Sequence, residues 1–255
     1  GAMTVEIRNL RKGSLHNSMC NRLRHIKMLP CLSIVQALEG AYEVRLDNGS
    51  LQRVEAGAAF IAPRYVRQDI THYVSESSGY MSARWIFLEV TVEGAYLEDV
   101  FELPPVFPDP GIPRRFFEDL FASDDGCDSM IAAYRLVQAL LPLAKRKERL
   151  PDGMRDVLSF LRMHFREKIT IRQLADILHL SESAFYPVFR RYTGQTAVSY
   201  LNTLRLTEAA SLLKSTRSTI TEIAGASGFS NVFYFSNQFK KQYGCSPRTY
   251  REQDL

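Results

Sequence analysis

Apolar and polar residues alternate in short runs over much of the first hundred positions. Tyr42, Val44 and Leu46 are apolar at every second position, and the Asn48-Gly49 pair that follows suits the positive φ angles of a tight hairpin turn. Similar runs recur from about residue 32 to residue 92. They predict about five to eight antiparallel strands between residues 5 and 92, each half-buried. Closing such a sheet into a small barrel would remove its exposed edges.

Prolines separate this region from a helical one. Five prolines crowd residues 104–113, and proline fixes φ and lacks the N–H donor that helices and inner strands need. Beyond them the apolar period becomes helical, over residues 116–121 and 131–143. The second helix is expected to end in the basic cluster 145–149, at the negative end of its dipole. Its apolar face either packs on the barrel or pairs with a second copy, which would make the protein a homodimer.

The last hundred residues contain an internal repeat. Residues 174–181 match residues 223–230 at an offset of 49, and residues 185–196 match residues 235–246 at an offset of 50. One extra residue therefore follows Ser230. Each copy predicts a short helix, a tight turn, a hydroxyl cap and a second helix, which is the spacing of a helix-turn-helix.

Single residues indicate the turns and helix starts of the two copies. Gly228 suits a left-handed turn, and His179 occupies the same place in the first copy at a higher conformational cost. Ala175 and Ala224 are small where two helices must cross closely. The expected caps are Thr170 and Ser181 in the first copy, and Thr219 or Thr221 together with Ser230 in the second.

The second helix of the second copy has the dimensions and side chains of a DNA-reading helix. A helix about 10–12 Å across fits the roughly 12 Å major groove of B-form DNA. Phe235 and Phe239 lie at i, i+4 and face the core, which turns the other side of the helix outward. Asn237 suits hydrogen bonds to adenine. The base-facing candidates are Val232, Phe233, Ser236 and Asn237, and the phosphate-facing candidates are Arg190, Arg191, Arg205, Lys240 and Lys241.

The charge distribution favours a polyanionic partner for the C-terminal part. Residues 1–150 carry 18 Lys and Arg against 19 Asp and Glu, whereas residues 151–255 carry 14 against 9. No run approaches the roughly 18 apolar residues of a membrane span, and the four cysteines form no C-x-x-C pair. We therefore expect a cytoplasmic protein with reduced thiols and no membrane partner. The opening Gly1-Ala2-Met3 is typical of a scar left by tag removal.

Several motifs of the second copy identify a family. They are Ile220-Thr221-Glu222-Ile223-Ala224, Gly228-Phe229-Ser230, Tyr234-Phe235-Ser236, Phe239-Lys240-Lys241, Tyr243-Gly244-Cys245-Ser246-Pro247 and Tyr250-Arg251. With them, residues 152–251 resemble the DNA-binding domain of the AraC/XylS family of bacterial transcription regulators. The resemblance implies seven helices, with two helix-turn-helix units joined by a linking helix near residues 198–214 and placed in successive major grooves. It also implies a cupin-like effector and dimerisation domain before them, and double-stranded DNA and RNA polymerase as partners.

Pro187 departs from the family's pattern, which often has a base-reading Arg at this position, the equivalent of Asn237. A proline about six residues past the Ser181 cap removes one helical hydrogen bond and crowds a carbonyl, at a cost of about 3 kcal/mol in a regular helix. We therefore expect this helix to be kinked or to start late, and the second unit to carry most of the specificity. The first unit's weaker base-reading candidates are Ser183, Tyr186 and Arg190.

The N-terminal region is expected to bind a small-molecule effector, for which a sugar is one candidate. Trp85, the only tryptophan, lies where some sugar-sensing relatives have a pocket aromatic, and Gln68 stands near the family's frequent pocket histidine. His72 is a third candidate, although core packing of Trp85 and a satisfied or surface position of His72 are the simpler interpretations. Arg22, Arg24 and Arg84 either bind an anionic effector or face water. The five histidines include no H-x-H pair, so neither a metal nor another cofactor is expected.

These patterns together predict an α+β protein. Residues 1–103 form a cupin-like antiparallel β-barrel that binds the effector, residues 104–150 form linker and dimerisation helices, and residues 151–255 form an all-α DNA-binding domain with two helix-turn-helix units. The expected function is that of a sequence-specific, effector-controlled activator of transcription, not an enzyme. Two alternatives stay open: a constitutive DNA-binding protein with a non-sensing barrel, and a cupin enzyme with a helical tail, which would need metal ligands that the sequence lacks.

Overall fold

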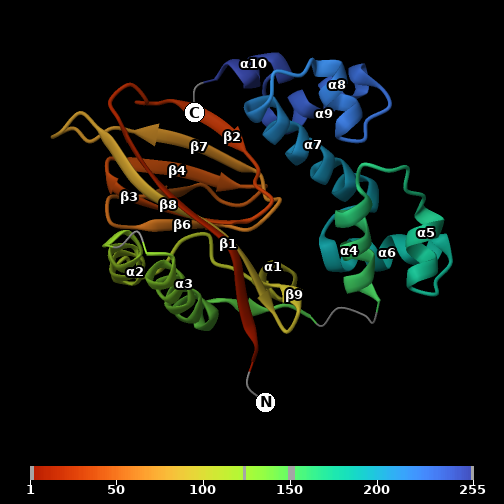
Figure 1. The fold of residues 1–255 in the computed structure, drawn as a ribbon, viewed down its shortest axis with the longest axis horizontal. Helices are drawn as coiled ribbons and strands as arrows, with labels where there is room; N and C mark the ends of the chain where they lie inside the picture. The colour runs from red at the N-terminus through yellow and green to blue at the C-terminus, as the bar shows by residue number, and fades with distance from the viewer. Residues whose placement is uncertain (1–2, 123–124, 149–152, 254–255) are drawn as a thin grey trace. The chain divides into compact units, whose positions relative to one another are not determined.

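The chain divides into two compact units, Gly1–Lys147 and Glu148–Leu255. The computed structural model describes residues 3–122, 125–148 and 153–253 of it. The first unit is built on β-sheets with helices beside them, and the second unit is helical (Figure 1).

The strands of the first unit form two antiparallel sheets. The larger has the order β1-β8-β3-β6, with β9 paired to the end of β8, and the smaller has the order β2-β7-β4-β5. The larger sheet consists of β1 (Val5–Asn17), β3 (Leu32–Glu39), β6 (Ala59–Ala62), β8 (Met81–Val92) and β9 (Ala95–Tyr96). The smaller consists of β2 (Arg24–Lys27), β4 (Ala41–Leu46), β5 (Gln52–Val54) and β7 (Gln68–Tyr73). The predicted antiparallel strands are confirmed.

The predicted hairpin joins β4 to β5, but its turn differs from the expectation. The positive φ angle lies at Asp47 (47°), and neither Asn48 nor Gly49 has one. The reason is a contact with the loop before β7: the Asp47 N–H donates to the Arg67 carbonyl, and an Asp47 carboxylate oxygen accepts from the Arg67 N–H, both at 2.8 Å. A short side chain that bonds locally tolerates this conformation.

The larger sheet is buried on both faces. Ile34 on one face packs in a core with helices α2 (Gly111–Ala122) and α3 (Gly126–Leu140), which lie beside the sheets in Figure 1. Val35 on the opposite face packs in a second core together with Val44 of the smaller sheet. Successive residues of a strand point to opposite faces, so every position of Leu32–Ala37 is buried.

The proline-rich segment is bounded by short elements. A helical turn, α1 (Leu97–Val100), leads into strand β10 (Phe101–Glu102). Helix α2 takes in Pro113 within its first turn, where a missing N–H is tolerated. Helix α3 is followed by a 3-10 turn at Leu141–Leu143.

The basic cluster after this turn is not the end of a helix, so that prediction is wrong. Lys145 and Arg146 form a short strand, β11, which pairs with Phe101 and Glu102 of β10. This pairing joins residues far apart in the sequence, and helical periodicity carries no signal for it.

The second unit contains the seven expected helices among its described residues. They are α4 (Met154–His164), α5 (Ile171–Ile177), α6 (Glu182–Thr193), α7 (Ala197–Ser215), α8 (Ile220–Ala226), α9 (Val232–Tyr243) and α10 (Pro247–Glu252). Helices α5 and α6 form the first helix-turn-helix, and α8 and α9 form the second. Helix α7, the expected linking helix, contacts α6 on one side of it in the sequence and α8, α9 and α10 on the other.

Candidate nucleic-acid interface

Each helix-turn-helix begins with a reciprocal cap. The Thr170 hydroxyl accepts from the Gln173 N–H at 3.3 Å, and the Gln173 side chain accepts from the Thr170 N–H at 2.8 Å. Thr219 and Glu222 repeat this arrangement at 3.2 and 2.7 Å, so Thr219 rather than Thr221 is the cap. Both caps satisfy N–H groups that open helices leave unpaired.

The second helices are capped at equivalent positions by different residues. The Ser181 hydroxyl accepts from the Ala184 N–H at 3.3 Å, as expected. In the second copy the cap is Asn231, whose side-chain oxygen accepts from the Tyr234 N–H at 2.9 Å, and the prediction of Ser230 is wrong. The reason is the extra residue of the second copy, because the offset of 50 that relates the second helices carries position 181 to 231.

Both tight turns use a left-handed residue. The φ angle is 54° at His179 and 89° at Gly228, as the sequence predicts. A Cβ atom on Gly228 would lie 2.8 Å from the Arg166 Cα atom, so this turn also needs glycine for space.

Helix α9 separates a buried aromatic face from an exposed polar one. Phe235 and Phe239 are fully buried, and Tyr243 continues this face. The Phe233 side chain is 79% exposed, away from the buried face of the helix. Among the other candidates of this helix, Asn237, Lys240 and Lys241 are exposed, and Val232 and Ser236 are partly buried.

Helix α6 also has a buried aromatic face and an exposed face, but it lacks a polar side chain at the position equivalent to Asn237. Phe185 and Phe189 are buried, and the exposed candidates are Ser183, Tyr186, Arg190 and Arg191. The helix is continuous from Glu182 through Pro187 to Thr193, so the alternative of a late start is wrong. Pro187 is exposed where α9 has Asn237, and it presents no polar side-chain atom there.

The side chains expected to contact phosphates differ in how firmly other residues hold them. An Arg191 guanidinium nitrogen lies 2.8 Å from a Glu148 carboxylate oxygen, and both side chains are more than half exposed, so solvent and DNA compete easily for this pair. Arg205, in contrast, donates to the carbonyls of Phe165 and Glu167 at 2.6 and 2.8 Å. Burial also lowers its pKa. Arg205 therefore holds α7 against the loop after α4, and two of its guanidinium nitrogens are already engaged, so fewer donors remain for the expected phosphate contact.

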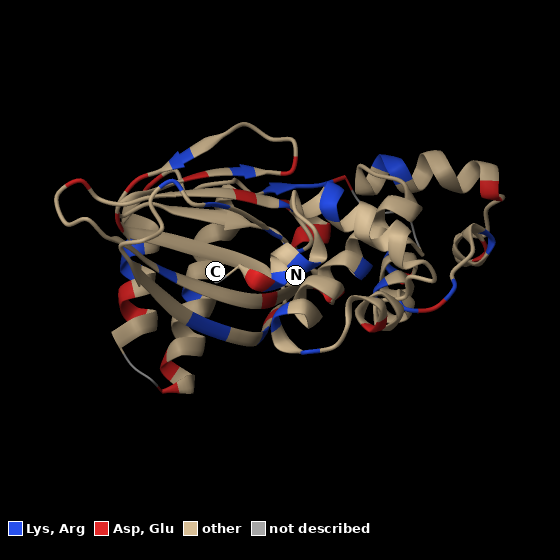
Figure 2. Cartoon of the chain, turned by 90° about the horizontal axis from the view of Figure 1, so that it is seen from above, with Lys and Arg blue, Asp and Glu red and all other residues tan. Residues whose placement is uncertain are grey.

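Two exposed basic residues beside the helix-turn-helix units were not predicted from the sequence as candidate phosphate contacts. Lys168 and Arg217 each stand two positions before the cap of a helix-turn-helix, at Thr170 and Thr219. The offset of 49 relates them, so extending the repeat upstream would have found both. Basic and acidic residues are otherwise interspersed along the helices of this unit (Figure 2).

In the first unit, the three effector candidates face the space between the two sheets. Gln68, Ile70 and His72 stand at every second position of β7 and therefore lie on the same face of that strand. Ile70 belongs to the core against which Trp85 packs. His72 is 4% exposed, with its Nδ1 atom 3.2 Å from the Leu23 carbonyl oxygen, and burial lowers its pKa. Gln68 is fully buried, and neither polar atom of its side chain has a hydrogen-bond partner. Trp85 stacks on Phe87 with a centroid distance of 4.3 Å.

The three arginines considered for an anionic effector lie elsewhere. Arg24 forms a two-bond pair with Asp69 at 2.7 and 2.6 Å, and Arg22 is exposed. Arg84 donates to Gln36 at 3.1 Å on the face of the larger sheet that α2 covers.

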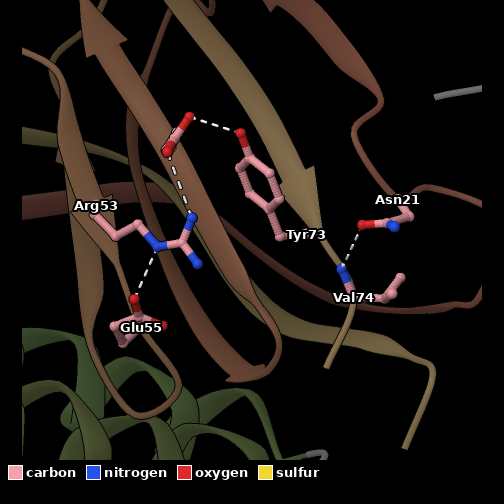
Figure 3. A network of polar contacts seen from close by, with 6 residues as sticks. Asn21, Arg53, Glu55, Tyr73 and Val74 are labelled. Carbon is pink, nitrogen blue, oxygen red and sulfur yellow. Dashed lines mark hydrogen bonds and ion pairs between the residues drawn. The ribbon is translucent and has the colours of Figure 1, made fainter. Parts of the chain in front are cut away.

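A surface pocket of about 500 Å³ lies at the edge of the smaller sheet, and Figure 3 shows the polar contacts among residues that line it. Its Arg53 side chain donates to Glu55 at 2.8 Å and lies 4.7 Å from the centre of the Tyr73 ring. The Tyr73 hydroxyl donates to Glu43 at 2.8 Å. The polar groups of Arg53, Glu55 and Tyr73 thus bond to one another or to Glu43, while Arg22 and Glu76 complete the charged part of the lining.

Two absences concern the described residues. In the ranges 3–122, 125–148 and 153–253, no three His, Cys, Asp or Glu side chains are grouped as a metal ion would require. Over the same ranges, helices with the length and apolar character of a membrane span are absent.

Comparison with known proteins bears on the second unit most directly. A family model described as a helix-turn-helix domain matches residues 174–253. The chain is 33% identical over 105 residues to the helix-turn-helix-type transcriptional regulator YobQ of Bacillus subtilis, covering 41% of this chain and 44% of that protein. It is also 33% identical over 186 residues to the transcriptional activator RhaS of Salmonella arizonae, covering 69% of this chain and 60% of that protein.

The chain spans about half the length of the curated relatives it matches. Among solved structures, it resembles ToxT from Vibrio cholerae, crystallised with a bound unsaturated fatty acid, with a TM-score of 0.67 over 95% of this chain and 94% of that one. At 13% identity this likeness concerns the fold alone.

Proposed function

Since the chain belongs to the AraC/XylS family of helix-turn-helix transcription regulators, we propose that it binds specific DNA sites and activates transcription there. It acts in the cytoplasm as a transcription factor and not as an enzyme. The observation that carries the proposal is the two-faced helix α9, with Phe235 and Phe239 buried and Phe233 and Asn237 exposed.

In this proposal α9 enters the major groove and reads bases. Asn237 pairs with an adenine, Ser236 bonds to a neighbouring base edge, and Phe233 with Val232 contacts a thymine methyl group. In α6, Ser183 and Tyr186 make fewer base contacts, because Pro187 occupies the central position. The phosphates are met by Arg190, Arg191, Lys240 and Lys241, which fix the register without reading sequence.

The first unit supplies control. Residues 1–103, as a cupin-like barrel, bind a small effector between the two sheets, near Trp85, Gln68 and His72. ToxT, which is similar in fold, was crystallised with an unsaturated fatty acid, so a lipid-like acid joins a sugar among the effector classes to be tested. The effector acts by binding one arrangement of the chain better than another, since equal affinity for both would change nothing.

Residues 104–150 provide the dimer contact in this proposal. On α3 the Ile131 side chain is 51% exposed and the Tyr134 side chain 40% exposed, although Leu136 and Val137 of the same helix are buried in the unit's own core. An exposed apolar stripe of this kind is suited to pairing with a second copy. RNA polymerase is the remaining partner, because several relatives carry the name of activators.

The direct test is selection from a pool of randomised DNA duplexes with the full chain. We expect enrichment of one motif whose best-defined bases lie in a single major-groove segment, the one that α9 occupies. A second, less defined segment should lie about one helical turn away. Recovery of duplexes without any common motif would reject sequence-specific binding.

A further inference from the structure

The surface pocket of about 500 Å³ lies on the outer face of the smaller sheet. Tyr73 follows the buried His72 on β7, and Arg53 precedes the buried Val54 on β5. Successive side chains of a strand point to opposite faces, so Tyr73 and Arg53 point away from the space between the two sheets. The pocket is therefore a different place from the one where Trp85 and His72 lie.

Contacts with the backbone fix the walls of this pocket. The segment before β2 is tied to the end of β7, because the Asn21 side chain accepts from the Val74 N–H at 3.3 Å (Figure 3). On another side, a Cβ atom on Gly40 would lie 2.2 Å from the Tyr73 carbonyl oxygen, so the turn between β3 and β4 packs closely against the same strand end. A pocket with walls held in this way needs little rearrangement to accept a ligand.

Arg22 lines the pocket in a conformation that arginine seldom adopts. Its φ angle is 60°, in the left-handed region that favours glycine and asparagine. Its N–H donates to the His72 carbonyl at 2.7 Å, which holds the backbone in place. The side chain is exposed, and among the residues that the structure describes its guanidinium has neither a hydrogen bond nor an ion pair. A strained backbone that carries an unengaged charge points to a functional role for that charge.

Arg22 shares this freedom with one other charged residue of the lining, Glu76. Arg53 donates to Glu55 at 2.8 Å, so the charges of these two residues compensate each other. Glu76 is exposed and, within the described part of the chain, forms no hydrogen bond or ion pair. The lining thus presents one unengaged cation and one unengaged anion. A ligand with a single charge would meet one of them with the wrong sign, whereas a zwitterion satisfies both.

The rest of the lining suits a short apolar group. Ala41, Ala56, Val74 and the ring of Tyr73 lie beside the charged residues. The Arg53 guanidinium carbon lies 4.7 Å from the centre of the Tyr73 ring, which orients this ring at the pocket (Figure 3). A volume of about 500 Å³ is in the range of small-ligand pockets and leaves room for one aliphatic or aromatic side chain.

We propose that this pocket, which we call the Arg22 pocket, binds a free α-amino acid with an apolar side chain. The carboxylate of the ligand bonds to the Arg22 guanidinium, its ammonium group bonds to the Glu76 carboxylate, and its side chain lies against Tyr73. The inference goes beyond the proposed function, since neither DNA binding nor an effector between the sheets requires this site.

Ligands that lack one charge test the two contacts separately. The full chain is titrated by calorimetry with leucine and with phenylalanine, each beside its N-acetyl derivative, which has no ammonium group, and its amide, which has no carboxylate. We expect at least one of the two amino acids to bind saturably and at least tenfold more tightly than both of its derivatives. No saturable binding, or a preference of less than tenfold over either derivative, would overturn the proposal.

Two variants assign the charges. Arg22→Asn removes the guanidinium, and asparagine tolerates the positive φ angle, so the fold is retained. We expect this variant to bind the amino acid at least tenfold more weakly and the amide as before, because the amide has no carboxylate for Arg22. Glu76→Gln should weaken binding of the amino acid likewise and leave the N-acetyl derivative unchanged. Arg115→Asn, at an exposed position of α2, is the matched control and should alter none of these affinities.

Thermal unfolding separates a lost contact from lost structure. Arg22→Asn should unfold at the temperature of the unchanged chain or above it, because the left-handed conformation costs asparagine less than arginine. Unchanged amino-acid binding in Arg22→Asn or in Glu76→Gln would overturn the Arg22 pocket. Binding that is lost in Gln68→Leu but kept in Arg22→Asn would place the ligand between the sheets and would overturn it as well.

Discussion

At the scale of single residues, Asn237 and Pro187 show how two equivalent positions diverge in chemistry. They lie at the same place on α9 and α6, and both are exposed. Asn237 can donate and accept hydrogen bonds at a base edge, whereas proline can do neither. The difference is visible in the sequence once the repeat is aligned.

Replacing Asn237 by Ala should weaken binding to the selected DNA site by about 1–3 kcal/mol and leave non-specific binding nearly intact, because alanine cannot form the hydrogen bonds to the base. Competition binding against a scrambled duplex measures both affinities. Asn48→Ala, in the exposed β4–β5 turn, is the control and should change neither. Equal reductions on the two duplexes would exclude a base-reading role.

Lys27, on β2, is a partly buried lysine whose charge costs stability. Its pKa falls from 10.5 to about 8 in the folded chain, so the folded state binds this proton less tightly than the unfolded state does. The penalty of this partly buried charge is therefore full below about pH 8 and disappears as pH rises through about 8 toward 10.5.

Lys27→Met should accordingly raise the free energy of unfolding at pH 7 by about 1–3 kcal/mol, and the gain should shrink by pH 9.5. Urea denaturation at the two pH values measures it. Lys145→Met should stay within about 0.5 kcal/mol of the unchanged chain, as surface substitutions do. A Lys27→Met variant that is less stable at pH 7 would mean that the ammonium is stabilised in a way that the structure does not contain.

At the scale of elements, periodicity and the repeat predicted most of the second unit. The helices of the two helix-turn-helix units, three of the caps and both left-handed turns follow from local signals at residues such as Thr170 and Gly228, whereas the number of seven helices and the linking helix came from the family resemblance. The exception is the cap of α9. The extra residue in the turn of the second copy moves this cap from the expected Ser230 to Asn231.

Contacts between distant segments could not be predicted from the sequence. The pairing of Lys145 and Arg146 with β10, the bonds of Arg205 to the loop after α4, and the approach of Lys27 to Phe87 each join residues dozens of positions apart. No periodic pattern encodes such contacts. The candidate DNA-reading residues could be predicted because they lie on one helix, whereas the contact of Lys27 with Phe87 could not, because it joins strands of two different sheets.

Helix α6 gives a prediction of its own. Pro187→Ala should raise the free energy of unfolding by about 1–3 kcal/mol, because an alanine N–H can bond to the Ser183 carbonyl and the ring clash disappears. Chemical denaturation measures the gain. Pro247→Ala, at the first turn of α10 where no donor is missed, should bring none. A destabilised Pro187→Ala variant would show that the proline is required by its surroundings.

At the scale of the whole molecule, the charge division and the two units assign separate tasks. The excess of basic residues lies in the part that carries the helix-turn-helix units, and the effector candidates Trp85, Gln68 and His72 lie in the β-sheet unit. We expect DNA affinity to depend on salt through the first feature and on a small effector through the second.

Lys241→Ala should weaken binding to all duplexes alike, because it removes one positive charge that neutralises a phosphate. The slope of log affinity against log salt should become shallower by about 0.9. Titrations between about 50 and 200 mM salt measure this slope. Lys145→Ala serves as the comparison, since it removes the same charge from the other unit. A slope unchanged by Lys241→Ala would reject the proposed phosphate interaction.

The central claim is that the carboxy-terminal unit distinguishes one DNA sequence from others through the exposed face of α9. The most direct measurement is the ratio of the full chain's affinities for the selected duplex and for a scrambled duplex of equal composition at about 150 mM salt. We expect a ratio on the order of a thousand or more, falling about ten- to a hundredfold in Asn237→Ala. A ratio near one, or a high ratio untouched by changes at Asn237 and Phe233, would contradict it.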